Sequence, residues 1–277
     1  MPLITSDNDL PRSLNTPTKQ VRRIKKLVLE HLGSASKQID RPPVQGMYSR
    51  TFFVKLADGR EVVVQFRTEQ LDLDAFRVAK GALGDVVPEA TALPDQELAE
   101  EGAWAYSFNR LPGKMWVHGV AGKGADGRVA VNKSLGRVFS RARLCVPRSA
   151  LMAILASQLD EVAAYRSLLE GLLNKLDELG SLPLWVTDYD LNDVNVLIDE
   201  ACDVTGVIDW ELSAPKPFGV GFGRIHTLAG EFTGGEFWMP DEFEVAERAF
   251  WSELFALPKF ITYRIPALRG DEPPYKE

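Results

Sequence analysis

A tight turn between two β-rich runs is the feature that most constrains the fold of this chain. Residues 48–56 and 61–67 are rich in β-branched and aromatic side chains, and the segment Ala-Asp-Gly-Arg separates them. The Asp58-Gly59 pair supplies the positive backbone φ angles of a tight turn. The sequence therefore predicts an antiparallel hairpin at this point.

The segments around this hairpin predict a small β-rich lobe. Residues 18–32 follow a proline, carry an apolar stripe and stop at Gly33, which is the pattern of an amphipathic helix. A second helix is expected at residues 72–83, and short strands are expected at 86–88 and 104–108. Residues 1–16 are polar and without periodicity, so we expect a flexible leader there.

Helical patterns dominate after residue 110. A glycine-rich loop is expected at residues 119–127, followed by a strand-loop-strand segment at 184–210 and a loose C-terminal tail. Helices are expected at residues 129–144, 149–159, 162–179 and 241–257. The predicted fold class is α+β, with a small antiparallel β lobe over residues 17–109 and a larger, mainly helical lobe over 110–277.

Composition excludes several classes of function. A net charge of −7 over 277 residues argues against broad nucleic-acid binding, which needs a basic face. No run of 18 apolar residues indicates a membrane span, and the N-terminus does not resemble a signal peptide, so a cytoplasmic protein is expected. Cys145 and Cys202 lie far apart without a CxxC pattern, which indicates buried apolar residues and neither a disulfide framework nor a zinc site.

The segment from residue 184 to residue 210 contains the candidate catalytic and metal-binding residues. Two apolar runs, 195–198 and 204–208, flank a polar turn and predict a second hairpin. Asp190 and Asn195 lie five residues apart at its start, and Asp209 follows its end. Because the ends of a hairpin lie together, these polar side chains are expected to converge.

This arrangement suits phosphoryl transfer. A carboxylate must accept or orient the proton of the attacking hydroxyl, and Asp190 fits that role. Oxygen ligands must hold Mg²⁺ against the phosphates, and Asn195 with Asp209 fit that role. The alternative is that Asp190 and Asn195 are ordinary turn residues, which both types commonly are.

The motifs also resemble a known family. Asp-Leu-Asn-Asp-Val-Asn-Val-Leu-Ile-Asp, starting at Asp190, followed by Val-Thr-Gly-Val-Ile-Asp-Trp-Glu, is similar to the signature of the aminoglycoside phosphotransferase and choline kinase-like family. The chain is similar in particular to fungal phosphotransferase-domain proteins of unassigned substrate. The resemblance implies a protein-kinase-like two-lobed fold, use of ATP and Mg²⁺, a catalytic Asp190, and Asn195 and Asp209 as metal ligands.

Other parts of the chain take part in this resemblance. The hairpin at residues 48–67, preceded by Gly46, looks like the family's nucleotide-binding loop and following strand. The segment 106–113, which includes Asn109 and Leu111, resembles the link between the lobes, whose backbone contacts adenine. The acceptor implied is the hydroxyl of a small molecule, which the sequence does not identify.

Two positions depart from the family pattern. Asp188 stands where the family has a histidine, which adds negative charge beside Asp190. Gln65 stands where kinase-like proteins place a lysine for the nucleotide phosphates. Arg67 is expected on the same face of the strand and could replace that lysine. The rival hypothesis is a pseudokinase or repurposed scaffold that binds a ligand or partner, or catalyses a nucleotide-independent reaction.

For several other polar and aromatic residues the sequence also allows a purely structural role. Trp210 is expected in the core, and His226 is expected to be a packed or exposed histidine without a metal. An aromatic set interleaved with glycines either lines a pocket beside the metal site or forms a packed wall, and the sequence favours neither. Its members are Phe218, Phe222, Phe232, Phe237 and Trp238.

Overall fold

The computed structural model describes residues 3–119, 122–144, 183–210, 215–222, 225–233 and 236–256. The chain divides into two units, one from the segments 1–73 and 88–111, the other from 74–87 and 112–277. The first holds an antiparallel sheet, and helices with short strands make up the described part of the second. The predicted α+β class is confirmed. In these described ranges no helix is both long and apolar enough to cross a membrane.

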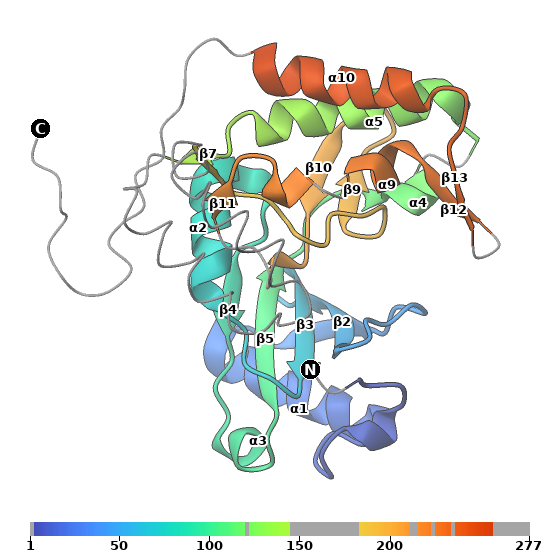
Figure 1. Cartoon of the computed structure of the whole chain (residues 1–277). Coiled ribbons are helices and arrows are strands. Elements are labelled where there is room, and N and C mark those ends of the chain that lie inside the picture. Colours follow the sequence, from blue (N-terminus) through green and yellow to red (C-terminus); the bar gives the residue numbers. More distant parts are fainter. Residues whose placement is uncertain are drawn as a thin grey trace, which may run out of the picture. The chain divides into compact units, whose positions relative to one another are not determined.

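A five-stranded antiparallel sheet forms the centre of the first unit (Figure 1). Its order is β1-β2-β3-β5-β4, and its central hairpin is the one that the Asp58-Gly59 turn predicts. Gly59 has a φ angle of 93°, which a residue with a side chain rarely adopts. The strands are β1 (Ser36–Asp40), β2 (Ser49–Leu56), β3 (Glu61–Arg67), β4 (Ala90–Ala92) and β5 (Trp104–Asn109).

Helix α1 (Pro17–Leu32) supplies the other half of this unit's core. Thr16 caps its first turn by accepting a hydrogen bond from the Lys19 backbone N–H, and Gly33 ends it with a φ angle of 69°. Its buried stripe belongs to one cluster with Phe52 and Phe66 of the central strands. The predicted helix is confirmed, because its start, stop and apolar period all agree.

The N-terminal segment is not the loose leader that its polarity suggests. Residues 3–16 include a short 3₁₀ turn, η1 (Asp7–Asp9), and bury Ile4, Leu10 and Leu14 in the same core. Asp7 forms ion pairs with Arg41 and with the buried Arg50. The expectation of a flexible leader is therefore wrong for the described residues. The few apolar side chains of residues 3–16 have no helical or strand period, so the sequence does not predict their burial. They nevertheless pack into the core from an irregular backbone.

In the second unit, helices α5 (Gly124–Phe139) and α10 (Phe243–Ala256) lie side by side (Figure 1). Gly136 makes this approach possible, because an added methyl group would overlap with the Phe250 carbonyl. The helix predicted at residues 129–144 runs instead from 124 to 139, so the glycine-rich loop is shorter than expected and residues 143–144 form a strand. The shorter helices are α2 (Leu73–Leu83), α4 (Trp116–Gly119) and α9 (Ile225–Ala229), with 3₁₀ turns η2 (Gly84–Val86) and η6 (Val220–Phe222).

Short antiparallel strands complete the second unit. They form the sheets β10-β9-β6 and β11-β8-β7 and a separate hairpin of β12 with β13. Their bounds are β6 (Lys114–Met115), β7 (Arg143–Leu144), β8 (Leu184–Trp185), β9 (Val196–Ile198), β10 (Val204–Val207), β11 (Lys216–Pro217), β12 (Glu231–Thr233) and β13 (Glu236–Trp238). The predicted second hairpin is β9 with β10, and it is confirmed.

Three other predictions have different outcomes. The strand expected at residues 86–88 is wrong, because a 3₁₀ turn ends at Val86 and the strand is β4, a few residues later. Cys202 is a free, buried cysteine, as expected. The helices expected at residues 149–159 and 162–179, together with Cys145 and the C-terminal tail, lie outside the described residues.

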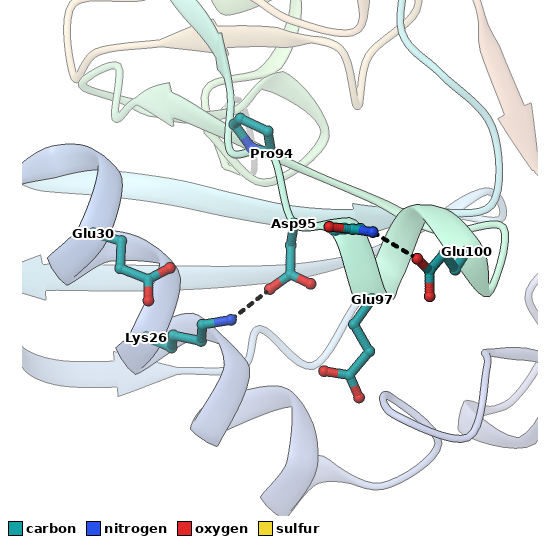
Figure 2. Close-up of a pocket in the computed structure, with 7 residues that line it drawn as sticks. Lys26, Glu30, Pro94, Asp95, Glu97 and Glu100 are labelled. Carbon is teal, nitrogen blue, oxygen red and sulfur yellow. Dashed lines mark hydrogen bonds and ion pairs between the residues drawn. The ribbon is translucent and has the colours of Figure 1, made fainter.

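The side chain of Asp95 holds helices α1 and α3 (Gln96–Glu100) together in the first unit. It caps α3 by accepting a hydrogen bond from Leu98 N–H and forms an ion pair with Arg23. A second ion pair joins it to Lys26 (Figure 2). Only 2% of this side chain is exposed, whereas Glu97, which pairs with the same arginine, is 63% exposed. Burial alone raises the pKa of Asp95, but the Leu98 N–H and the two cations outweigh it and lower the pKa.

We therefore expect Asp95→Ala to lower the free energy of unfolding at pH 7 by about 2 kcal/mol, because it removes a cap and a buried ion pair. The matched variant Glu97→Ala should cost less than about 0.5 kcal/mol. Since a lowered pKa stabilises the fold only above the unfolded carboxyl pKa, the cost of Asp95→Ala should shrink as the pH falls below about 4. Urea unfolding at pH 7 and pH 3 measures both effects, and equal costs for the two variants would contradict this role.

Candidate active site

The loop that carries Asp190 starts from a rigid strand. Strand β8 ends at Trp185, whose indole Nε1 donates a hydrogen bond of 2.8 Å to the Phe139 carbonyl of α5. The next residue, Val186, donates its backbone N–H to the Ala142 carbonyl at 2.8 Å. Asp188 is fully buried, and its Oδ1 accepts the Asp190 backbone N–H at 2.9 Å. Asp188 thus orders this loop by accepting a backbone hydrogen bond.

A polar turn closes the five-residue interval between Asp190 and Asn195. Asn195 Nδ2 donates to the Asp190 carbonyl at 3.0 Å and lies 3.5 Å from the Asp190 carboxylate Oδ2. Asn192 completes the turn, because its Oδ1 accepts the backbone N–H groups of Val194 and Asn195. The structure brings Asp190 and Asn195 together, as the sequence predicts.

Asp209 follows the β9–β10 hairpin, directly after a residue that is hydrogen-bonded to Asn195. Val207 pairs with Val196, and Ile208 N–H donates to the Asn195 carbonyl at 2.9 Å. Asp209 follows directly, is exposed, and has a φ angle of 71°. This left-handed backbone is uncommon for a residue with a side chain and is found preferentially at functional sites. Trp210 is fully buried and donates Nε1–H to the Val207 carbonyl at 2.7 Å, so it is a core residue.

The donor atoms at this hairpin end suit a hard cation. Asn195 uses its amide nitrogen to hold the Asp190 loop, and its Oδ1 has no hydrogen bond to any described residue. An amide oxygen and a carboxylate are ligands that Mg²⁺ accepts. No group of three or more histidine, cysteine, aspartate or glutamate side chains in the described ranges forms a metal cluster of another kind.

In the first unit, four polar side chains line one face of the central hairpin. Arg67 donates from Nη1 to Gln65 Oε1 at 3.3 Å, and Gln65 Nε2 donates to Thr51 Oγ1 at 3.3 Å. Ser49 Oγ lies 3.4 Å from the same hydroxyl. The register of β2 against β3 explains this row, because Ser49 faces Arg67 and Thr51 faces Gln65. Arg67 therefore lies on the face of Gln65, as the sequence predicts.

The residues expected beside adenine have structural contacts of their own. Asn109 Oδ1 accepts the Glu89 N–H at 2.6 Å, and its backbone N–H donates to the Glu89 carbonyl. Leu111 is largely buried, at 9% exposure. The Arg110 guanidinium lies 4.2 Å from the centre of the Phe53 ring. Their predicted contact with adenine stays a prediction.

The aromatic set after Asp209 separates into two groups. Phe218 and Phe222 pack with Trp185 and Trp251 at ring distances of 5.1–6.5 Å, which makes them part of a packed wall. Phe237 and Trp238 are exposed in the β12–β13 hairpin. The side chains of Phe232 and His226 lie outside the described part of the structure.

Two contacts at the Asp190 loop escape sequence analysis. Lys216 of β11 places its Nζ 4.7 Å from the centre of the Tyr189 ring. Gly221 in η6 lies against Thr187, where an added methyl group would overlap with the threonine side chain. Neither pair belongs to a motif, and each joins segments about 30 residues apart, so no local signal could have revealed them.

A shallow pocket of about 450 Å³ lies elsewhere, between α1 and α3 of the first unit (Figure 2). Its lining is polar and includes no predicted site residue. The most buried acid in it, Asp95, already has Arg23 and Lys26 as partners. The residues that line it are Lys26, Glu30, Pro94, Asp95, Gln96, Glu97 and Glu100.

Gly221→Ala tests how tightly η6 supports the Asp190 loop. We expect a loss of about 3 kcal/mol or more in the free energy of unfolding, because the new methyl group overlaps with several atoms of the Thr187 side chain. Gly219→Ala is the control: it strains a positive φ angle of 96° but meets no atom within 4 Å, so it should cost about 1 kcal/mol. Equal losses for the two variants in urea unfolding would show that contact with Thr187 is unimportant.

Comparison with solved structures finds similarity to macrolide and aminoglycoside phosphotransferases. No protein-family model and no curated protein matches it. Macrolide 2'-phosphotransferase MphH from Brachybacterium faecium is 15% identical over 83% of this chain and 82% of its own, with a TM-score of 0.48. A putative aminoglycoside phosphotransferase from Ralstonia eutropha is 16% identical over 87% and 82%, also with a TM-score of 0.48.

A third similar structure is a thermostable mutant of aminoglycoside phosphotransferase APH(4)-Ia, solved with AMP-PNP and hygromycin B. It is 16% identical over 70% of this chain and 72% of its own, with a TM-score of 0.46.

Proposed function

We propose that this protein is an ATP- and Mg²⁺-dependent phosphotransferase that acts on a hydroxyl group of a small molecule. The observation that carries the proposal is the junction at Asn195, whose side chain holds the Asp190 loop and whose backbone holds the strand end before Asp209. These three residue types at one hairpin end meet the needs of phosphoryl transfer.

Asp190 is the proposed catalytic base. Its backbone is fixed at both ends, by Asp188 Oδ1 at the N–H and by Asn195 Nδ2 at the carbonyl. A fixed backbone limits the positions open to the carboxylate, which accepts the proton of the attacking hydroxyl. As the hydroxyl oxygen bonds to the γ-phosphorus of ATP, the bond between that phosphorus and the β-phosphate oxygen breaks and ADP leaves.

Asn195 and Asp209 are the proposed metal ligands, through an amide oxygen and a carboxylate. Mg²⁺ held by these two residues would supply positive charge that offsets the negative charge of the nucleotide phosphates. The hydrogen bond from Asn195 Nδ2 to the Asp190 carbonyl leaves its Oδ1 for this task.

The proposed phosphate contact lies among the four polar side chains on one face of the central hairpin. Arg67 carries the positive charge, and Gln65 orients it through the 3.3 Å hydrogen bond from Nη1. Guanidinium groups suit phosphate because they present several donors in one plane. The backbone around Asn109 and Leu111 is the proposed adenine contact, and the acceptor is a small molecule of unassigned class.

The rival function is a pseudokinase or repurposed scaffold. One observation favours it: the Gln65 amide is occupied on both sides, by Arg67 and by Thr51, and lacks the charge of a lysine. A scaffold of this kind could bind a ligand or partner without transferring phosphate. Nucleotide binding and turnover distinguish the two functions.

The first test is Asp190→Ala with Asp193→Ala as the control, since Asp193 is an exposed acid of the same loop. We expect wild-type protein to gain thermal stability with Mg·ATP and to release phosphate slowly, with water as the acceptor. Asp190→Ala should lower this turnover by roughly 10²–10⁴-fold and keep the thermal shift. Asp193→Ala should retain both. Absence of a shift in the wild type at millimolar nucleotide would favour the scaffold.

The second test concerns Arg67. Arg67→Met should weaken Mg·ATP binding roughly tenfold or more, because a charge-assisted hydrogen bond contributes about 1.5–3 kcal/mol. Arg22→Met, an exposed arginine of α1, is the matched control and should leave affinity unchanged. Isothermal titration calorimetry measures both, and equal affinities would remove Arg67 from the site.

A further inference from the structure

A lysine lies over the aromatic residue of the Asp190 loop. The Lys216 Nζ is 4.7 Å from the centre of the Tyr189 ring, within the range of a cation–π contact. Lys216 is half-buried and forms no ion pair with a described residue. The Tyr189 hydroxyl is buried and has no hydrogen-bond partner among the described residues. Burial lowers the pKa of Lys216 and raises that of Tyr189.

The position of Lys216 is fixed by the strand that leads into the loop. Strand β11 pairs with β8, with Lys216 opposite Trp185, and Phe218 N–H donates to the Pro183 carbonyl at 2.8 Å. The Trp185 and Phe218 rings also meet edge to face, with centres 5.1 Å apart. The lysine and the start of the loop therefore belong to one pair of hydrogen-bonded strands.

The tyrosine stands between two residues that a hydrogen bond joins. Tyr189 lies between Asp188 and Asp190 in the sequence. Asp188 is fully buried, and its Oδ1 accepts the Asp190 backbone N–H at 2.9 Å. A cation held over the intervening ring therefore limits the movement of the residue between them.

We propose that Lys216 is a positioning residue of the phosphotransfer site and acts through Tyr189. The ammonium group holds the tyrosine ring, and the ring fixes the backbone between Asp188 and Asp190. This inference rests on the proposed function, because it assigns Lys216 a part in the same reaction.

Release of phosphate from Mg·ATP, with water as the acceptor, is the first readout. Lys216→Met keeps most of the apolar stem but loses the charge, and should lower turnover about tenfold, the scale of a partly buried cation–π contact. Lys216→Arg and Tyr189→Phe keep the cation and the ring, so each should retain at least about half of wild-type turnover. Tyr189→Leu should act like Lys216→Met, and the double variant should be no slower than Tyr189→Leu alone.

The contact itself has a readout that needs no activity. Reductive methylation with ¹³C-formaldehyde gives each lysine an NMR signal and keeps its charge, and Lys216→Arg identifies the signal of residue 216. A group over an aromatic face is shielded, so this signal should lie upfield of exposed lysines and move downfield in Tyr189→Leu. Wild-type unfolding midpoints in all variants would exclude simple misfolding.

Each contrary result has a distinct meaning. Turnover of Lys216→Met equal to that of an active wild type, losses that multiply in the double variant, or an unshifted Lys216 signal would overturn this inference alone. A wild type that neither binds nor hydrolyses Mg·ATP would overturn the proposed function, and the role of Lys216 with it.

Discussion

Two of the hydrogen bonds that Asn195 makes hold the candidate active site together. Its side chain donates to the Asp190 carbonyl at 3.0 Å, and its backbone carbonyl accepts the Ile208 N–H at 2.9 Å. One residue thus joins the loop of the proposed base to the strand end of the second proposed metal ligand. Because both bonds use groups other than Oδ1, this oxygen is left for a ligand, so the same residue serves structure and chemistry.

The unusual backbone at Asp209 is maintained by its neighbour. A left-handed conformation costs a residue with a side chain about 1–2 kcal/mol. Full burial of Trp210, together with its hydrogen bond to the Val207 carbonyl, offsets this cost, since burial of a large apolar side chain contributes about 1.5–3 kcal/mol or more. The tryptophan therefore stabilises the turn on which the exposed carboxylate sits.

Local signals explain which predictions succeeded. The Asp58-Gly59 turn, the Pro17 and Gly33 ends of α1, and the Asp190 to Asn195 interval each depend on neighbours in sequence, and each is found as expected. The burial of the N-terminal segment depends on a core formed by residues distant in sequence. Its polar composition therefore led to the wrong prediction of a flexible leader. Strand β4 is a short Ala-Thr-Ala run that pairs with β5 and carries no β signal of its own. The position of Lys216 over the Tyr189 ring depends on the pairing of β11 with β8, and no sequence motif predicts that pairing.

At each of the two departures from the family pattern, a positively charged side chain contacts the same strand or loop. At Gln65 a positive charge is missing, and Arg67 provides one two residues along the same face, joined to Gln65 by a hydrogen bond. At Asp188 a negative charge is added, and Lys216 places a positive charge against the next residue. Arg67 is 5% exposed and Lys216 is half-buried, so the packing of the fold fixes where each positive charge lies. Under the proposed function, Arg67 contacts the nucleotide phosphates and Lys216 positions the loop of the catalytic base.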